Sequence, residues 1–173
     1  MSRKALLVID MLNDFIDPKG ALYVGDQARG VVEPIRHEID RARREGIEVI
    51  YICDRHLESD PEFLMFPKHC VAGTWGAEIV PELAPMPHDR VIPKRRYSAF
   101  FQTDLDLTLR ELGVTQIIVV GVCTNICDLY TVADARMLNY KVVVPKDCVS
   151  SFDQEAHRFA LAEMERTLGA EVV

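Results

Sequence analysis

Short apolar runs that alternate with segments of helical spacing constrain the fold of this chain more than any other feature. The runs are rich in β-branched residues and lie at Lys4–Ile9, Ile47–Cys53, Arg90–Ile92, Gln116–Val120 and Tyr140–Val144. An uninterrupted apolar run of this length is typical of a strand that is buried on both faces of a sheet. A short final strand is expected at Ala170–Val173. The pattern therefore predicts a sheet of about six buried strands.

Between the runs, apolar residues recur with the spacing of one helix face. These stripes are Val32, Ile35, Ile39 and Ala42; Leu105, Leu109 and Leu112, closed by Gly113; Ile126, Tyr130, Ala133 and Met137; and Phe152–Leu168, capped by Asp153. Parallel strands need crossover connections, and these pack right-handedly back on the sheet. We therefore expect one α/β domain over residues 1–173, with a mainly parallel sheet and helices on both faces.

Length and charge narrow the class of protein. The chain has 173 residues, of which 49% are apolar, and this suffices for one hydrophobic core. Its net charge of -7, with both signs interspersed, disfavours nucleic acid or a membrane surface as a partner, because both require a clustered positive field. A small-molecule substrate fits better. No apolar run is long enough to span a membrane and Ala5–Ile9 is too short for a signal peptide, so we expect a cytoplasmic protein with free thiols.

Ligands of an open parallel sheet bind at the carboxyl ends of its strands. The residues that follow the predicted strands are Asp10, Asp54, His56, Lys94 and the segment Gly121–Cys127. We expect them to converge on one crevice. The irregular stretch Asp54–Asp89 is longer than most connections in a compact domain, and such loops usually serve function.

Cys127 is the strongest candidate for a nucleophile. In the segment GVCTNICDLYTVADA it lies at the start of a predicted helix, which Thr124 or Asn125 would cap. Free backbone amides and the helix dipole favour a thiolate there and would lower the pKa of the thiol. A buried, inert cysteine is an equally good interpretation of the local sequence. Cys123 is interpreted as packing, or as a resolving thiol if its sulfur meets that of Cys127.

Asp10 and Lys94 are the candidates for acid–base chemistry. Asp10 closes an apolar strand, where a desolvated carboxylate could take the proton of a thiol and return it to a leaving amine. Lys94, in VIPKRRYSAF, would orient that carboxylate and temper its charge. The alternatives are a turn cap for Asp10 and a solvated basic turn for Lys94.

The segments VIDMLNDF, VIPKRRYSAF and GVCTNICDLYTVADA resemble, in order, spacing and flanking residues, the isochorismatase-like cysteine hydrolases. The resemblance covers essentially the whole chain. It implies a Rossmann-like three-layer sandwich and a catalytic triad of Asp10, Lys94 and Cys127. It also implies a cis peptide bond between Val122 and Cys123, with the backbone amides of Cys123 and Cys127 forming an oxyanion hole.

The long loop offers ligands for a metal. Asp54, His56 and His69 supply one carboxylate and two imidazoles, a set suited to zinc, iron or manganese, although scattered residues of these types often lie on surfaces. DRH followed by FPKHCVAGTWGAEIVPEL is similar to the metal-binding loop of nicotinamidases. This resemblance assigns Asp54, His56 and His69 as ligands of a divalent metal, with zinc favoured, and Glu62 as a further acidic ligand.

The same subgroup suggests a substrate. Phe15, Phe66 and Tyr97 match positions that line a planar ring in nicotinamidases, although each could simply pack in the core. The resemblance implies an amidase of NAD salvage that converts nicotinamide or a close aromatic amide to the acid and ammonia through a cysteine thioester. It also implies a homo-oligomer. A metal-independent carbamoyl or amide hydrolase, and a non-enzymatic metal-binding or thiol-switch protein, are the alternatives.

Two positions depart from the family pattern. Arg55 stands where an aromatic or small residue is expected, and Asp128 stands where an aliphatic residue is usual. Asp128 suits the first turn of a helix, but it would oppose a thiolate if it pointed at Cys127. Arg55 would pair either with Asp128 or with an acidic group of the substrate.

Overall fold

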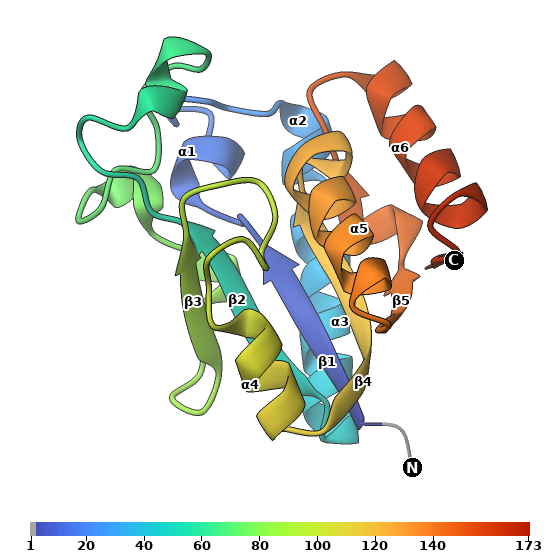
Figure 1. Cartoon of the computed structure of the whole chain (residues 1–173). Coiled ribbons are helices and arrows are strands. Elements are labelled where there is room, and N and C mark those ends of the chain that lie inside the picture. The colour runs from blue at the N-terminus through green and yellow to red at the C-terminus, as the bar shows by residue number, and fades with distance from the viewer. Residues whose placement is uncertain (1–2) are drawn as a thin grey trace.

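A twisted parallel sheet runs through the centre of the molecule in the computed structural model, which describes residues 3–173 (Figure 1). Its strands are β1 (Arg3–Ile9), β2 (Glu48–Asp54), β3 (Arg90–Lys94), β4 (Val114–Val122), β5 (Lys141–Val144), β6 (Val149–Ser150) and β7 (Glu171–Val172). The order across the sheet is β3-β2-β1-β4-β5-β7, and β6 pairs in parallel with the end of β4. The predicted sheet is confirmed, and β6 is a strand that the sequence pattern did not predict.

Helices cover both faces of this sheet, as expected (Figure 1). The α-helices are α1 (Asn13–Ile16), α2 (Asp26–Arg29), α3 (Val32–Glu45), α4 (Leu105–Glu111), α5 (Leu129–Met137) and α6 (Gln154–Arg166). Single turns of tighter or wider helix are η1 (Pro61–Leu64), η2 (Trp75–Ala77), η3 (Pro81–Leu83), η4 (Thr124–Asp128) and η5 (Lys146–Cys148). Helix α3 packs on one face, whereas α4 and α5 pack on the other. The predicted α/β fold is therefore correct.

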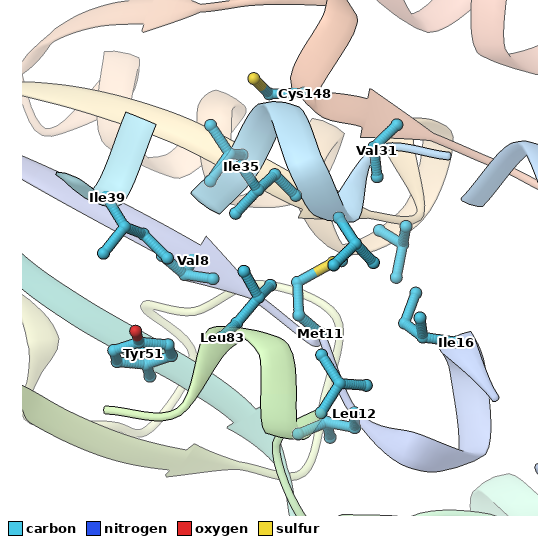
Figure 2. Close-up of a cluster of buried hydrophobic side chains, with 14 of the residues drawn as sticks. Val8, Met11, Leu12, Ile16, Val31, Ile35, Ile39, Tyr51, Leu83 and Cys148 are labelled. Carbon is cyan, nitrogen blue, oxygen red and sulfur yellow. The ribbon is translucent and has the colours of Figure 1, made fainter. Parts of the chain in front are cut away.

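Alternate residues of β1 divide the core between the two faces. Leu6 and Val8 belong to the apolar cluster beneath α3, whereas Leu7 and Ile9 belong to the cluster beneath α4 and α5. Figure 2 shows the first cluster, in which Ile39 of α3 lies next to Val8. Because both faces are covered, the strand is apolar at every position from Ala5 to Ile9, as is typical of a strand inside an α/β sheet.

Local signals also fix the ends of the helices. The Asp153 carboxylate accepts hydrogen bonds from the backbone amides of Glu155 and Ala156, so the predicted cap of α6 is confirmed. Gly113 follows α4 with a φ of 68°, a left-handed conformation that favours glycine. Within residues 3–173, none of the helices combines the length and apolar character needed to cross a bilayer.

Candidate active site

Asp10 lies at the centre of the crevice because β1 runs between β2 and β4 in the sheet. It directly follows β1 in a left-handed conformation, with a φ of 52°, and its side chain is completely buried. Its Oδ1 accepts a hydrogen bond of 2.8 Å from the backbone amide of Asp54, and its Oδ2 lies 2.7 Å from Nζ of Lys94. Neighbouring strand ends thus hold both oxygens of this carboxylate.

Lys94 contacts the carboxylates of Asp10 and Asp54 and the thiol of Cys127. It ends β3 and is the register partner of Asp54, which ends β2. Its buried ammonium forms ion pairs with Asp10 and Asp54 and donates a 3.4 Å hydrogen bond to Sγ of Cys127. Burial alone would lower the pKa of Lys94, but the two carboxylates outweigh it and raise that pKa well above its usual value. The side chain is therefore a permanent cation between two acids.

Cys127 lies in η4, the turn that leads from β4 into α5. Its sulfur and an Asp10 carboxylate oxygen lie within 4.8 Å of each other. The expectation of a depressed thiol pKa is wrong: burial raises the pKa of Cys127 well above its usual value, although Lys94 opposes this. The resting sulfur is a neutral thiol, so its use as a nucleophile requires a base nearby.

The expected side-chain cap above Cys127 is also absent from the described residues. The Thr124 hydroxyl is hydrogen-bonded to Nδ1 of His157 at 2.8 Å, and the Asn125 amide oxygen accepts a bond from Ser151. Both side chains are therefore engaged with the segment around α6 instead of the first turn of their own helix. The expected cis peptide bond between Val122 and Cys123 is present.

Asp10 has the acidity that a base for this thiol needs. Burial, and then the negative charge of Asp54, raise the pKa of Asp10 to about 6, although Lys94 opposes the shift. A carboxylate with this pKa is ionised at neutral pH and still accepts a proton readily. The cluster can therefore move a proton from sulfur to oxygen inside a pocket that is shielded from bulk water.

Asp54, His56 and His69 form a second cluster beside the first, on the loop side of β2. Atoms Oδ2 of Asp54 and Nε2 of the two histidines lie within 4.8 Å of one another. Nε2 of His56 is buried without a hydrogen-bond partner among residues 3–173. One carboxylate oxygen and two imidazole nitrogens that face a common point match the donor set that zinc prefers. These residues fit a divalent metal.

Glu62 borders the same cluster. Its Oε1 lies 3.9 Å from Nε2 of His56, and its side chain is buried. Burial raises the pKa of Glu62, whereas Lys94 and His56 lower the pKa of Asp54 against the effect of its burial. Asp54 is thus the ionised acid of the donor set, and Glu62 lies near enough to His56 to offer a further carboxylate oxygen to the cluster.

Helix α1 anchors the loop that carries His69. Oδ2 of Asp14 accepts a 2.7 Å hydrogen bond from the backbone amide of Cys70, and the Asn13 side chain donates to the carbonyl of Trp75. Gly76 packs so closely on Asp14 that a Cβ atom there would lie 2.0 Å from the carboxylate. The local sequence alone therefore does not determine the position of His69, because this position also depends on helix α1, which is far away in the chain.

A small cavity joins the two clusters. It has a volume of about 30 Å³ and is lined by Asp54, Glu62, His69, Cys123 and Cys127 together with Phe15, Phe66 and Tyr97. Leu22, Ile126 and Phe152 also line it, and the sequence analysis did not select them. This volume holds about two water molecules. Phe152 is 40% exposed.

Arg55 and Asp128 do not form the pair that the sequence suggested. Arg55 is exposed, whereas Asp128 is completely buried. Neither carboxyl oxygen of Asp128 has a hydrogen-bond partner among the described residues. Burial and the charge of Asp10 raise the pKa of Asp128 well above its usual value. Asp128 is thus a neutral acid behind the nucleophile. All five cysteines are free.

Comparison with known proteins places this geometry in a family. The isochorismatase domain model matches residues 4–173. The nicotinamidase/pyrazinamidase PncA from Bacillus subtilis is 35% identical, with a TM-score of 0.94 over 99% of each chain.

Two further structures bear on the site. The pyrazinamidase of Pyrococcus horikoshii, solved in complex with zinc, is 31% identical with a TM-score of 0.93, over 99% of this chain and 98% of that one. The N-carbamoylsarcosine amidase from Thermoplasma acidophilum is 35% identical with a TM-score of 0.89, over 98% of this chain and 95% of that one. By its sequence and its fold together, the chain belongs to the isochorismatase family.

Proposed function

We propose that this protein is an amidase that hydrolyses nicotinamide, or a close aromatic amide, to the acid and ammonia. The observation that carries the proposal is the cavity itself: the thiol of Cys127 and the metal-donor residues Asp54 and His69 line one space together with Phe15, Phe66 and Tyr97. The buried base Asp10 lies next to this thiol, with a carboxylate oxygen within 4.8 Å of the sulfur. Aromatic side chains favour a flat ring, and the similar proteins from Bacillus subtilis and Pyrococcus horikoshii carry amidase names.

In the first half of the proposed reaction, Asp10 takes the proton of Cys127 as sulfur attacks the amide carbon. The carbonyl oxygen becomes an anion that the backbone amides of Cys123 and Cys127 stabilise. The carbon–nitrogen bond then breaks, Asp10 returns the proton to the leaving nitrogen, and ammonia departs. A thioester on Cys127 remains.

In the second half, Asp10 takes a proton from a water molecule that attacks the thioester carbon. The carbon–sulfur bond breaks, the acid is released, and Cys127 recovers its proton from Asp10. Lys94 holds Asp10 in place throughout and offsets the charge of Asp54.

The metal would be held by Asp54, His56 and His69, with Glu62 beside them. A bound divalent metal, with zinc favoured, supplies a Lewis acid at the wall of the pocket. Two of the aromatic residues lie against this donor set, because the ring of His69 is 5.4 Å from that of Phe15 and 6.3 Å from that of Phe66.

A carbamoyl substrate on the same triad is the second candidate. The similarity to N-carbamoylsarcosine amidase favours it, because that protein is as similar in sequence as PncA from Bacillus subtilis is. The two candidates share the chemistry of Cys127 and differ in the shape of the molecule that fills the cavity.

The test is ammonia release from nicotinamide, pyrazinamide and N-carbamoylsarcosine by the purified protein, before and after chelation. The Cys127→Ala variant is compared with Cys148→Ala, which alters a buried cysteine in the cluster beneath α3 (Figure 2). We expect release from the aromatic amides that is lost on chelation and in Cys127→Ala, and is kept in Cys148→Ala.

Release from N-carbamoylsarcosine alone would establish the second candidate instead. No release from any of the three, together with a reversible disulfide between Cys123 and Cys127, would contradict both amidase assignments and favour a thiol switch.

A further inference from the structure

The two histidines of the metal donor set are oriented in different ways. Nδ1 of His69 donates to the backbone carbonyl of Pro67 at 2.7 Å. Nδ1 of His56 instead contacts a carboxylate, Oδ2 of Asp60, at 3.0 Å. Both contacts leave Nε2 facing Asp54, at 3.4 Å for His56 and 3.9 Å for His69. Asp60 therefore contacts His56 at the ring nitrogen opposite the one that faces Asp54.

Asp60 is itself held firmly. Its side chain is 3% exposed, and its Oδ1 accepts a 3.0 Å hydrogen bond from the backbone amide of Glu62 at the start of η1. Nη1 of Arg96 lies 3.1 Å from Oδ1 and 3.2 Å from Oδ2. Together with the contact to His56, these donors leave the carboxylate little freedom to rotate.

Arg96 connects this carboxylate to the end of β3. It lies two positions after Lys94, and its Nη1 is also 3.7 Å from Oε2 of Glu62. A single guanidinium therefore contacts both acids of the turn that faces His56. The loop acids and the strand that carries Lys94 are held together at this point.

We propose that Asp60 and Arg96 are positioning residues for the metal site: Asp60 fixes His56 in the tautomer whose unprotonated Nε2 faces the metal, and Arg96 holds Asp60 in place. The proposal rests on the metal site of the proposed function. A carboxylate on the outer nitrogen also makes the imidazole a stronger donor than a carbonyl does, and loss of such a partner typically weakens metal binding 10- to 100-fold.

A purely structural role for Asp60, as the N-cap of η1, makes a different prediction. Asparagine caps helix starts about as well as aspartate, whereas alanine does not. If capping is all that Asp60 does, Asp60→Asn should bind metal as the wild type does. If Asp60 acts on His56, the loss of its charge should weaken binding even though the cap is kept.

The experiment measures Zn²⁺ affinity of the purified full chain by competition with a chromophoric chelator. We expect Kd to rise about 10-fold in Asp60→Asn and up to about 100-fold in Asp60→Ala, with a smaller rise in Arg96→Ala. The matched control is Asp89→Asn. The side chain of Asp89 is 1% exposed, and its Oδ2 lies 2.5 Å from Nη2 of Arg43 and accepts a hydrogen bond from the Met86 backbone amide. It contacts none of the metal donors. Its Zn²⁺ affinity should be unchanged.

Wild-type Zn²⁺ affinity in folded Asp60→Asn would overturn the proposal, and so would a wild-type protein that binds no Zn²⁺. If Asp60→Ala does not fold, Asp60→Asn and Arg96→Ala decide, because both keep the cap. Ammonia release is measured separately. A protein that binds Zn²⁺ through these residues but hydrolyses no amide would refute the proposed function and leave this inference intact.

Discussion

The two halves of the candidate site are built in different ways. Asp10 and Lys94 lie at the ends of β1 and β3, where the register of the sheet sets their positions, and Cys127 lies in the turn η4 that follows β4. His56 and His69 lie in the irregular connection after β2, where hydrogen bonds between side chains and backbone set theirs. One crevice can therefore combine residues that a rigid sheet positions with residues on a loop that hydrogen bonds hold in place.

The halves meet at one residue, Lys94, which forms two ion pairs. Lys94 binds Asp10 on the triad side and Asp54 on the metal side. Asp54 also donates its backbone amide to Asp10. We therefore expect the proposed chemistry and the proposed metal binding to be separable at most residues and coupled at Lys94 and Asp54.

The strongest test of separability is Asp10→Asn. The amide oxygen of asparagine can still accept the bond from the Asp54 backbone, but it cannot take a proton from Cys127. We expect kcat/KM for ammonia release to fall about 100- to 10,000-fold, while Zn²⁺ affinity stays at the wild-type value. Steady-state kinetics and chelator competition on the same preparation measure both. A parallel loss of Zn²⁺ affinity would show that the two halves are one unit.

Lys94→Met tests the coupling. Removing the ammonium leaves two buried carboxylates uncompensated, which costs about 3–5 kcal/mol of unfolding free energy. Urea unfolding of the metal-free protein measures this. Lys68→Met is the matched control, because Lys68 pairs with Glu58 on the surface and such pairs contribute about 1 kcal/mol or less. Equal losses in the two variants would contradict the role of Lys94 as the shared cation.

Asp128→Val tests the surroundings of Cys127, and we expect a smaller change in unfolding free energy. Asp128 is buried without a partner among residues 3–173, so replacing its carboxyl with an apolar group should stabilise the protein by about 1–3 kcal/mol at pH 7. An unfolded chain ionises this residue near a pKa of about 3.9, but the folded protein keeps it protonated because its pKa is raised.

The pH dependence follows from this difference. The wild type loses stability as pH rises above the unfolded pKa, since only the unfolded chain gains the ionised form, and the loss continues up to the folded pKa. The valine variant lacks this loss. Urea unfolding from pH 4 to pH 8 should therefore show a stability gap that widens with pH, and a constant gap would be inconsistent with a neutral Asp128.

The positions of Asp10, Lys94 and Cys127 could be predicted from sequence more directly than the strand and the packing around them. Asp10 and Lys94 follow or end apolar runs, so the rule for strand ends placed them in one crevice. The strand β6 was missed because Val149 and Ser150 are too few to form a pattern. The pKa of Cys127 was predicted in the wrong direction, since its burial depends on the packing of the whole layer and not on the helix start alone.

The metal side shows where sequence reasoning ends. His56 and His69 were selected through a family resemblance, whereas Asp60 and Arg96 were not selected at all. Asp60 is only four residues from His56, but Arg96 reaches it from beyond β3. Nothing in the local pattern signals a contact between segments that far apart. The caps at Thr124 and Asn125 failed for the same reason, because their partners His157 and Ser151 come from the α6 region.

The register between Asp54 and Lys94 has a consequence for how such a protein can be remodelled. These two residues end adjacent parallel strands, and the stretch between them leaves the sheet after Asp54 and re-enters it at Arg90, the register partner of Ile50. Its end points are therefore set by the scaffold, whatever its length or composition. A designer could exchange residues 55–89 as a cassette to change what the crevice recognises, and natural selection could diversify substrates by the same route without rebuilding the strands or the turn that carries Cys127.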